Sequence, residues 1–517
     1  MKQLNSFAVT LCLSGLFFLL VVSASPVSAD VRLPHIIGSN MVVQRDIPIP
    51  IWGWADPGEV VKVTFQKFEA STKADEKGKW MVKLPAVKAG GPYIMTITGK
   101  NSIKLNNILG GEVWLCSGEY NMWWPVTYSN NSDKEIAEAN YPQIRLLTVP
   151  NIAAGEPTDD INAVWNPCTP ATIPNFSAVL YFFGREIHKQ LNVPVGLINS
   201  SWGGTGIDVW TSADGFAAVP TFKNVTKQIK DAELEYKKII ADSLVPIENW
   251  INVTQKAIEE NTPIPPAPNW PRHPLHNIGH PVKPTILYNA MIHPLVPFAI
   301  RGVIWYQGEA NYSDGSIYYD KTKALVTGWR KAWNQGDFPF YYVQVAPLDY
   351  SVQKLSPQAL PKLWEAQTAA MAIPNTGMAV TTDISDINEM HPRNKQDVGK
   401  RLALWAFAKT YGLPNIVFSG PIYKSMSIEG DKIRIRFDYA GSGLTSRDDK
   451  PLNWFEIAGD DKKFVKAQAK IDGDTVVVYS DTVISPVAVR FGWLQTAQPN
   501  LINKERLPAS PFRTDNW

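Results

Sequence analysis

Polar and glycine residues follow four apolar runs of the sequence, in the segments 111–122, 198–205, 305–311 and 383–391. Each apolar run has the length and composition of a buried strand. Ligands of open α/β sheets bind beyond the carboxyl ends of the strands, so the turns after such strands are the natural candidates for chemistry. The sequence therefore places its candidate functional site in these four turns.

The residue types in these turns could support catalysis. Gly203 and Gly204 follow a strand as a pair, and their backbone amides could bind an oxyanion. A later turn carries the amide side chains of Gln307 and Asn311. Among seven histidines, His391 has acidic residues just upstream and a proline directly after it, which makes it the candidate general base. A turn histidine without a catalytic role is the alternative.

Several common catalytic motifs are absent from the sequence. It has no G-x-S-x-G, H-E-x-x-H or G-x-x-x-x-G-K-[ST] pattern, so classical α/β-hydrolase, zinc-protease and P-loop chemistries lose support. His273, His276 and His280 lie close together in the sequence, but the surrounding prolines make this a loop without fixed ligand geometry. We therefore expect neither a metal site nor a cofactor.

The pattern of elements divides the chain. Residues 1–29 have a positive start, an apolar core and a small-residue cleavage site, which are typical of a secretory signal peptide. Residues 30–107 alternate polar and apolar side chains and predict a β-sandwich-like domain, and residues 412–517 return to this pattern. Between them, 108–411 alternates strands with helical stretches, which predicts a parallel sheet with helices on both faces. An insertion at about 215–284, helical and then proline-rich, is predicted to form an amphipathic hairpin packed on this domain, with a partner-binding helix as the alternative.

Composition excludes some classes of protein. The 517 residues include 50 basic and 48 acidic side chains, with no basic stripe of the kind that binds nucleic acid. The apolar run near the N-terminus is shorter than the roughly 20 residues that span a membrane. We expect an exported protein, periplasmic or extracellular, with no membrane span and no nucleic-acid partner. The sequence makes no prediction of the oligomeric state.

Two cysteines remain after the predicted signal peptide, Cys116 and Cys168. In an oxidising compartment such a pair is a candidate disulfide. Closing a loop of this length would stabilise the fold by about 3–4 kcal/mol. Two buried thiols are the alternative.

The four turns resemble, in order and over essentially the whole chain from Leu33 onward, the sialate O-acetylesterases of the SGNH hydrolase superfamily. The first block of that family reads roughly C-S-G-Q-S-N-M, and residues 116–122 read C-S-G-E-Y-N-M. The resemblance implies an α/β fold, in which a flavodoxin-like SGNH hydrolase domain with a three-layered parallel sheet is flanked by N- and C-terminal β-rich domains. It also implies a secreted enzyme that removes acetyl groups from O-acetylated sialic acids or related glycans.

The resemblance assigns a role to each turn. Tyr120 stands where the family has its nucleophilic serine, and would attack the acetyl carbonyl. His391 would act as general base and then as general acid. Glu389 lies two residues before it, where the family usually has aspartate, and would orient the imidazole, with Asp386 and Asp383 as further candidates. The remaining turns would bind the oxyanion, through Gly204, Gln307 and Asn311.

The tyrosine leaves two functional classes open. The first is an esterase that uses Tyr120 or Ser117 in an unusual geometry, although a phenol keeps its proton at neutral pH. The second is a catalytically inactive glycan-binding protein in which Trp123 and Trp124 stack on sugars; packing under the first helix is the alternative for these two. Glu119 adds a carboxylate where the family has glutamine, and negative charge beside an oxyanion raises the barrier.

Overall fold

The computed structural model describes residues 30–276, 279–351, 354 and 356–517. The predicted signal peptide lies outside this part of the chain. The central domain is built on a sheet with the strand order β13-β12-β11-β7-β10-β8-β9. In that order the strands are Thr376–Ala379, Phe340–Val343, Gly302–Tyr306, Ser102–Gly118, Val195–Ser201, Tyr141–Thr148 and Asn166–Cys168.

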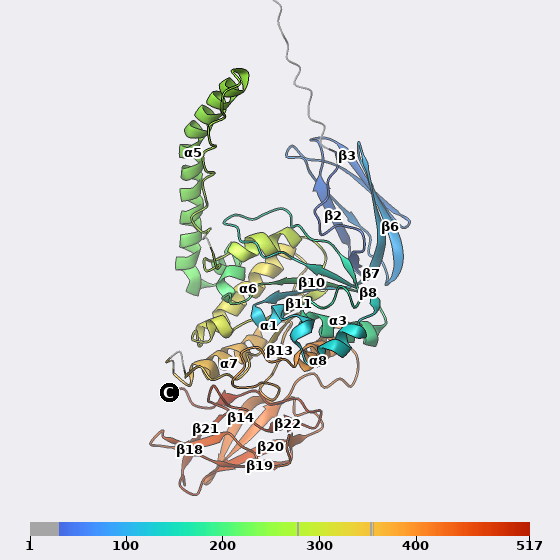
Figure 1. The fold of residues 1–517 in the computed structure, drawn as a ribbon. Helices are drawn as coiled ribbons and strands as arrows, with labels where there is room; N and C mark the ends of the chain where they lie inside the picture. Colours follow the sequence, from blue (N-terminus) through green and yellow to red (C-terminus); the bar gives the residue numbers. More distant parts are fainter. Residues whose placement is uncertain (1–29, 277–278, 352–353, 355) are drawn as a thin grey trace, which may run out of the picture.

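The sheet is parallel except for the pair β8 and β9. Successive residues of β7 enter different cores: Trp114 belongs to a cluster with helices α3 and α8, whereas Leu115 belongs to a cluster with α6 and α7. These helices span Ala178–Leu191, Lys395–Trp405, Ile317–Trp333 and Ala359–Ala369. Because side chains alternate along a strand, the two clusters lie on opposite faces of the sheet. The prediction of a three-layered α/β domain is confirmed (Figure 1).

The N-terminal β region contains six strands before the central domain begins. Strands β1 to β6 span Val42–Gln44, Ile49–Trp54, Val60–Phe65, Phe68–Lys73, Lys79–Leu84 and Gly90–Thr98. The long strand β7 pairs with β6 and β1 in this region and then continues into the central sheet. The predicted boundary between residues 107 and 108 therefore falls inside a strand that both regions share.

The C-terminal region is also built from β-strands, as expected. One sheet has the order β14-β15-β20-β19 and another the order β18-β17-β21-β23. The first comprises Ile422–Glu429, Lys432–Asp438, Thr475–Tyr479 and Gln468–Asp472, and the second Phe464–Lys466, Phe455–Gly459, Pro486–Phe491 and Phe512–Arg513. A short pair, β16 (Leu444–Ser446) with β22 (Leu501–Asn503), completes the region. Its buried side chains form a hydrophobic cluster of their own.

The insertion differs from its prediction. Its helix α5 (Lys223–Glu259) stands away from the body of the protein (Figure 1). Only Ile229, Ala232 and Ala257 of this helix are buried. The return segment contacts the helix instead, since the indole of Trp250 donates to the carbonyl oxygen of Pro265 at 3.0 Å. The insertion is a hairpin whose two arms pack mainly on each other. No helix in the described part of the chain combines the length and apolar character that crossing a membrane requires.

The disulfide prediction is wrong for this structure. Cys116 and Cys168 are both buried free thiols. Cys116 lies in β7 and Cys168 in β9, with β10 and β8 between these strands. Neighbouring strands are about 4.8 Å apart, so three steps separate the two cysteines by about 14 Å, roughly twice the span that a disulfide bridges. Spacing in the sequence did not reveal the order of the strands.

Candidate active site

Three of the four predicted turns begin side by side at one edge of the central sheet. Gly118, the last residue of β7, is in register with Ser201 at the end of β10 and with Tyr306 at the end of β11. The fourth turn reaches the same place through His391, whose ring lies against that of Tyr120. The structure therefore brings together the segments that the sequence singled out.

Gly118 sets the geometry of the first turn. Its φ angle is +137°, and a Cβ atom at this position would lie 2.1 Å from the carbonyl oxygen of Tyr306. Only glycine permits this backbone to approach β11 so closely. The next amide, that of Glu119, donates to the same carbonyl at 3.0 Å. Tyr120 then begins the short helix α1 (Tyr120–Trp123) at the edge of the sheet.

The ring of Tyr120 lies between the paired glycines and His391. Its side chain is 40% exposed. The ring centroid is 4.4 Å from that of His391, with an interplanar angle of 34°. On the other side, a Cβ atom built on Gly203 would lie 2.2 Å from Cδ2 of Tyr120. The phenol ring thus occupies the gap between the candidate base and the candidate oxyanion site.

Aromatic stacking holds the His391 ring. Besides Tyr120, the indole of Trp124 stacks on it at 5.0 Å and 20°. Burial lowers the pKa of His391 below its ordinary value of 6.5, and the cation of Lys395 lowers it further, whereas Glu389 opposes the shift. The imidazole is therefore neutral at pH 7 and able to accept a proton.

The candidate carboxylates do not form a hydrogen bond with the imidazole. Nδ1 of His391 lies 3.7 Å from Oε1 of Glu389, beyond hydrogen-bond distance. That oxygen accepts instead from the backbone amide of His391 at 2.9 Å. Asp386 accepts from the backbone amide of Asn388, and Asp383 forms two hydrogen bonds of 2.7 and 2.6 Å with Arg401. Stacking, rather than a carboxylate, orients the imidazole in this structure.

The oxyanion candidates differ in the donors that they have available. Gln307 is fully buried, and its Nε2 donates both to the carbonyl oxygen of Thr205 at 3.1 Å and to Oδ1 of Asn311 at 2.7 Å. Both amide protons of Gln307 are thus used within the protein. Asn311 donates one bond from Nδ2, to Asp314 at 2.7 Å, and retains a second proton. Gly204 has a φ angle of +74°, and its amide stays a candidate.

Glu119 is buried in the site, and this changes its expected effect. Its Oε1 accepts from the backbone amides of Gly308 at 2.9 Å and Ala310 at 3.1 Å. Burial raises the pKa of Glu119 well above its ordinary value, and the neighbouring carboxyl of Glu309 raises it further. A protonated Glu119 would still accept from these two amides, as a glutamine would. The raised pKa favours the neutral acid at this position, against the expectation of a negative charge.

Lys395, which the sequence analysis missed, lies buried beneath the stacked rings. Its Nζ donates to Oδ1 of Asn121 at 2.5 Å, and Nδ2 of Asn121 in turn donates to Glu309 at 2.5 Å. The ammonium also lies 5.7 Å from the ring centroid of Trp124. Burial lowers the pKa of Lys395 to about 7. The signal available in the sequence was its place four residues after His391, in the first turn of a helix.

Two further residues have different roles from those expected. His280, assigned to a loop without fixed geometry, donates from Nε2 to the carbonyl oxygen of Gly204 at 2.8 Å and so braces the paired glycines. Ser117, the alternative nucleophile, is completely buried in β7. A hydroxyl in that position cannot reach a glycan. In the described residues, no group of three or more histidine, cysteine or acidic side chains is placed to hold a metal ion.

The two tryptophans of the site are not equivalent. Trp123 is 36% exposed and contacts the Tyr120 ring at 5.2 Å. Trp124 packs between His391 and the exposed ring of Tyr128, which lies 5.4 Å from it. Trp123 therefore offers a free face to a ligand, whereas Trp124 serves mainly to support His391.

Comparisons with known proteins agree with this geometry. Residues 276–407, which include His391 and the turn after β11, match the family described as carbohydrate esterase, sialic acid-specific acetylesterase. The chain is 32% identical over 452 residues to the sialate O-acetylesterase of Mus musculus, covering 79% of each protein. It is 30% identical over 533 residues to that of Homo sapiens, covering 93% of this chain and 92% of the human protein.

A solved structure extends the similarity to the fold. The structure of a carbohydrate acetylesterase from Xanthomonas citri superimposes with a TM-score of 0.80 and 36% identity, covering 94% of this chain and 100% of that one. Sequence and fold agree over nearly the whole length, β-rich flanking regions included. This chain belongs to the sialate O-acetylesterase family of carbohydrate esterases.

Proposed function

We propose that this chain is an exported glycan-binding member of its family that hydrolyses acetyl esters poorly or not at all. The observation that carries the proposal is the position of the Tyr120 ring, against Gly203 on one side and 4.4 Å from His391 on the other. In acyl transfer the substrate carbonyl must lie between the nucleophile, the base and the oxyanion donors. Here the ring of Tyr120 lies against both Gly203 and His391, where the acetyl group would have to bind.

The surface beside this ring suits a sugar. Trp123, Tyr120 and Tyr128 expose 36%, 40% and 50% of their surfaces and follow one another over a single turn and the residues after it. Aromatic rings with one free face bind the apolar faces of sugars and lose little conformational entropy on doing so. We therefore propose an O-acetylated glycan, of the sialic acid class or related to it, as the ligand.

A second candidate is an esterase that uses the phenol, and the contact between Tyr120 and a neutral His391 favours it. The Tyr120 oxygen would add to the acetyl carbonyl while His391 takes the phenolic proton. Collapse of the adduct would break the bond between the acetyl carbon and the sugar oxygen, and the sugar oxygen would take the proton from His391. Water, deprotonated by His391, would then release acetate and restore the phenol.

Initial rates on p-nitrophenyl acetate separate the two candidates. We expect the native chain to be no faster than its His391→Ala variant, and Tyr120→Ser to be faster than both. Tyr439→Ser, which removes a phenol that is 39% exposed in the C-terminal region, is the control and should leave the rate unchanged. A native kcat within the enzymatic range of roughly 1–10³ s⁻¹ that His391→Ala abolishes would establish the esterase and reject our proposal.

Binding of the ligand requires its own measurement. Calorimetric titration with 9-O-acetylated N-acetylneuraminic acid should show binding to the native chain and a loss of at least about tenfold in affinity for Trp123→Ala. Trp270→Ala, which removes a tryptophan that is 64% exposed outside the site, is the control. Equal affinity of the native chain and of Trp123→Ala would show that the sugar does not stack on Trp123.

A further inference from the structure

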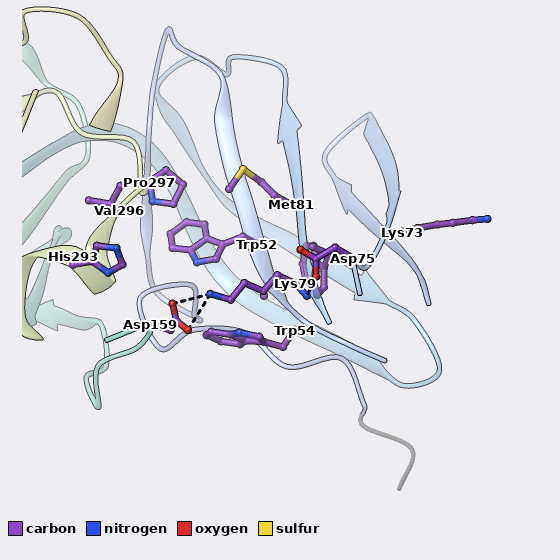
Figure 2. Close-up of a pocket in the computed structure, with 12 residues that line it drawn as sticks. Trp52, Trp54, Lys73, Asp75, Lys79, Met81, Asp159, His293, Val296 and Pro297 are labelled. Atoms are coloured by element: carbon purple, nitrogen blue, oxygen red, sulfur yellow. Dashed lines mark hydrogen bonds and ion pairs between the residues drawn. The ribbon is translucent and has the colours of Figure 1, made fainter. Parts of the chain in front are cut away.

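A cleft of about 380 Å³ separates the N-terminal β region from the central domain (Figure 2). One wall is the antiparallel ribbon of β2 and β5, and the other is the loop that carries His293, Val296 and Pro297. This loop precedes β11, whereas the candidate active site follows β11, so the two places lie at opposite ends of this strand. The volume lies within the range of about 300–1,000 Å³ that is typical of small-molecule sites.

The ribbon presents aromatic side chains on its outer face. Trp52 is in register with Met81, and Trp54 with Lys79, so these four side chains share one face. The intervening residue Gly53 and its partner Trp80 are buried on the other face. An outward strand face normally carries polar residues. Here the face carries two tryptophans and a methionine that is 43% exposed, and apolar side chains gathered on a surface are typical of a binding site.

Contacts within the protein cover these rings only in part. The guanidinium of Arg32 lies 4.4 Å from the ring centroid of Trp54 and covers one of its faces. Trp52 remains half-buried, and Figure 2 shows its ring reaching into the cleft toward the opposite wall. Trp52 packs in part against the hydrophobic core, and the rest of its ring is the stacking surface that this cleft offers.

Polar groups lie where a sugar stacked on Trp52 would direct its hydroxyls. Lys79 donates to both carboxylate oxygens of Asp159 at 3.0 Å, and both side chains are half-exposed, at 51% and 52%. Figure 2 shows this ion pair between the rings of Trp52 and Trp54. On the opposite wall, Nδ1 of His293 donates to the carbonyl oxygen of Thr158 at 2.9 Å, which leaves Nε2 as an acceptor.

The charges of the cleft indicate which sugars it would take. In the cleft the charge of Lys79 is balanced by that of Asp159, and Asp75 is the other anion of the lining, whereas Figure 2 shows the Lys73 side chain directed away. A sugar carboxylate would meet no net positive charge here, whereas hydroxyl groups would meet both donors and acceptors. We propose that this cleft is a second saccharide site, which binds an uncharged pyranose stacked on Trp52 and held by Lys79, Asp159 and His293.

Calorimetric titration of the full chain tests the site with lactose and cellotriose as uncharged probes and N-acetylneuraminic acid as a charged one. We expect an uncharged probe to bind with a Kd near 1 mM or below, and Trp52→Ala to weaken this binding at least about tenfold. Trp52→Phe keeps a stacking ring and should keep most of the affinity. Trp270→Ala removes an exposed tryptophan elsewhere and should have no effect.

The paired variant Lys79→Gln with Asp159→Asn removes the ion pair from the surface without emptying the core. It should also weaken binding of the uncharged probe, and it replaces Trp52→Ala if that variant fails to fold. Trp123→Ala separates the two sites, since it should leave this binding intact whatever happens at the active site. Absence of binding by both uncharged probes at about 20 mM, where a millimolar site is saturated, would overturn the proposal. Binding that Trp123→Ala abolishes and Trp52→Ala leaves intact would overturn it as well.

Discussion

The turn after β7 and the turn after β11 belong to one site, but their central side chains differ in burial and in hydrogen bonding. In the first, the Tyr120 side chain is 40% exposed, and its ring contacts the rings of Trp123 and His391. In the second, Gln307 is completely buried, and both its donors and its acceptor oxygen are used, the latter by the hydroxyl of Tyr318 at 2.7 Å.

This difference shows why one turn can keep the family's residues while the other changes. A buried amide that satisfies three partners supports folding, because its loss leaves several polar groups unpaired. An exposed nucleophile supports only the reaction, so replacing it costs little stability. Gln307 and Asn311 can therefore be present for the sake of folding alone, so their presence does not indicate activity. The residue at position 120 is the better indicator of catalysis.

The largest effect should come from restoring the family's residues in the first turn and beside the base. Glu119→Gln, Tyr120→Ser and Glu389→Asp together should raise the rate on an aryl acetate by at least about 10²-fold over the native chain. Members of a catalytic triad act as a unit, so the triple variant should gain far more than the sum of the single ones. Activity is measured by release of p-nitrophenol from p-nitrophenyl acetate.

Within that series, Tyr120→Ser should be the indispensable step. Glu119→Gln with Glu389→Asp, in which Tyr120 is kept, is the control and should remain at the native rate. A soluble triple variant without hydrolysis above background would contradict this prediction and show that the first turn and the base are not enough for catalysis.

Disrupting the second turn should instead reduce stability. Gln307→Ala removes hydrogen bonds to Thr205, Asn311 and Tyr318 and leaves a buried gap, so we expect a loss of about 3 kcal/mol in the free energy of unfolding. Urea denaturation followed by tryptophan fluorescence measures it. Gln190→Ala, at an exposed position of α3, should change stability by less than about 0.5 kcal/mol. Similar values for the two variants would refute the structural role of Gln307.

Lys395, which is linked to both turns through Asn121, should make stability depend on pH. Its pKa is about 7 in the folded protein and near 10.5 in the unfolded chain, so the unfolded chain binds more protons between these values. Stability should therefore rise with pH in this window. The difference in unfolding free energy between the native chain and Lys395→Met should grow by about 2 kcal/mol from pH 7 to pH 9.

The matched control for this measurement is Lys400→Met, an exposed lysine of the same helix. Its difference from the native chain should stay flat over the same pH range. A flat difference for Lys395→Met too would show that the buried amine keeps its proton at neutral pH.

The smallest effect concerns Glu119. Its pKa is raised in the folded protein, so its contribution to stability is present below pH 4.5 and is lost as pH rises toward the folded value. Glu119→Gln keeps both hydrogen bonds from the backbone and has no proton to lose. We expect it to be more stable than the native chain at pH 7 and equal to it at pH 4. Thermal unfolding at the two pH values tests this, with Glu138→Gln on the surface as control.

Much of the architecture could be predicted from the sequence because it depends on local periodicity. Alternation of strands and helices indicated the parallel sheet, and the turns at 198–205 and 305–311 proved to follow β10 and β11, which flank β7 in that sheet. The search for turns after strands also singled out His391, whereas its pairing with Tyr120 came from the family resemblance. The spacing of apolar residues predicts the helix of the α5 hairpin. Its position away from the body depends on contacts that this spacing does not encode.

From the sequence by itself, local periodicity determined the fold class, and the resemblance of its motifs indicated the family and the expectation that Tyr120 stands at the nucleophile position. Only the tertiary structure decided that Cys116 and Cys168 stand three strands apart, that burial raises the pKa of Glu119, and that the Tyr120 ring lies against His391. The physical reason is that strand order, burial and the packing of rings are set by contacts between residues far apart in the chain, and the charge of a buried group follows from those contacts.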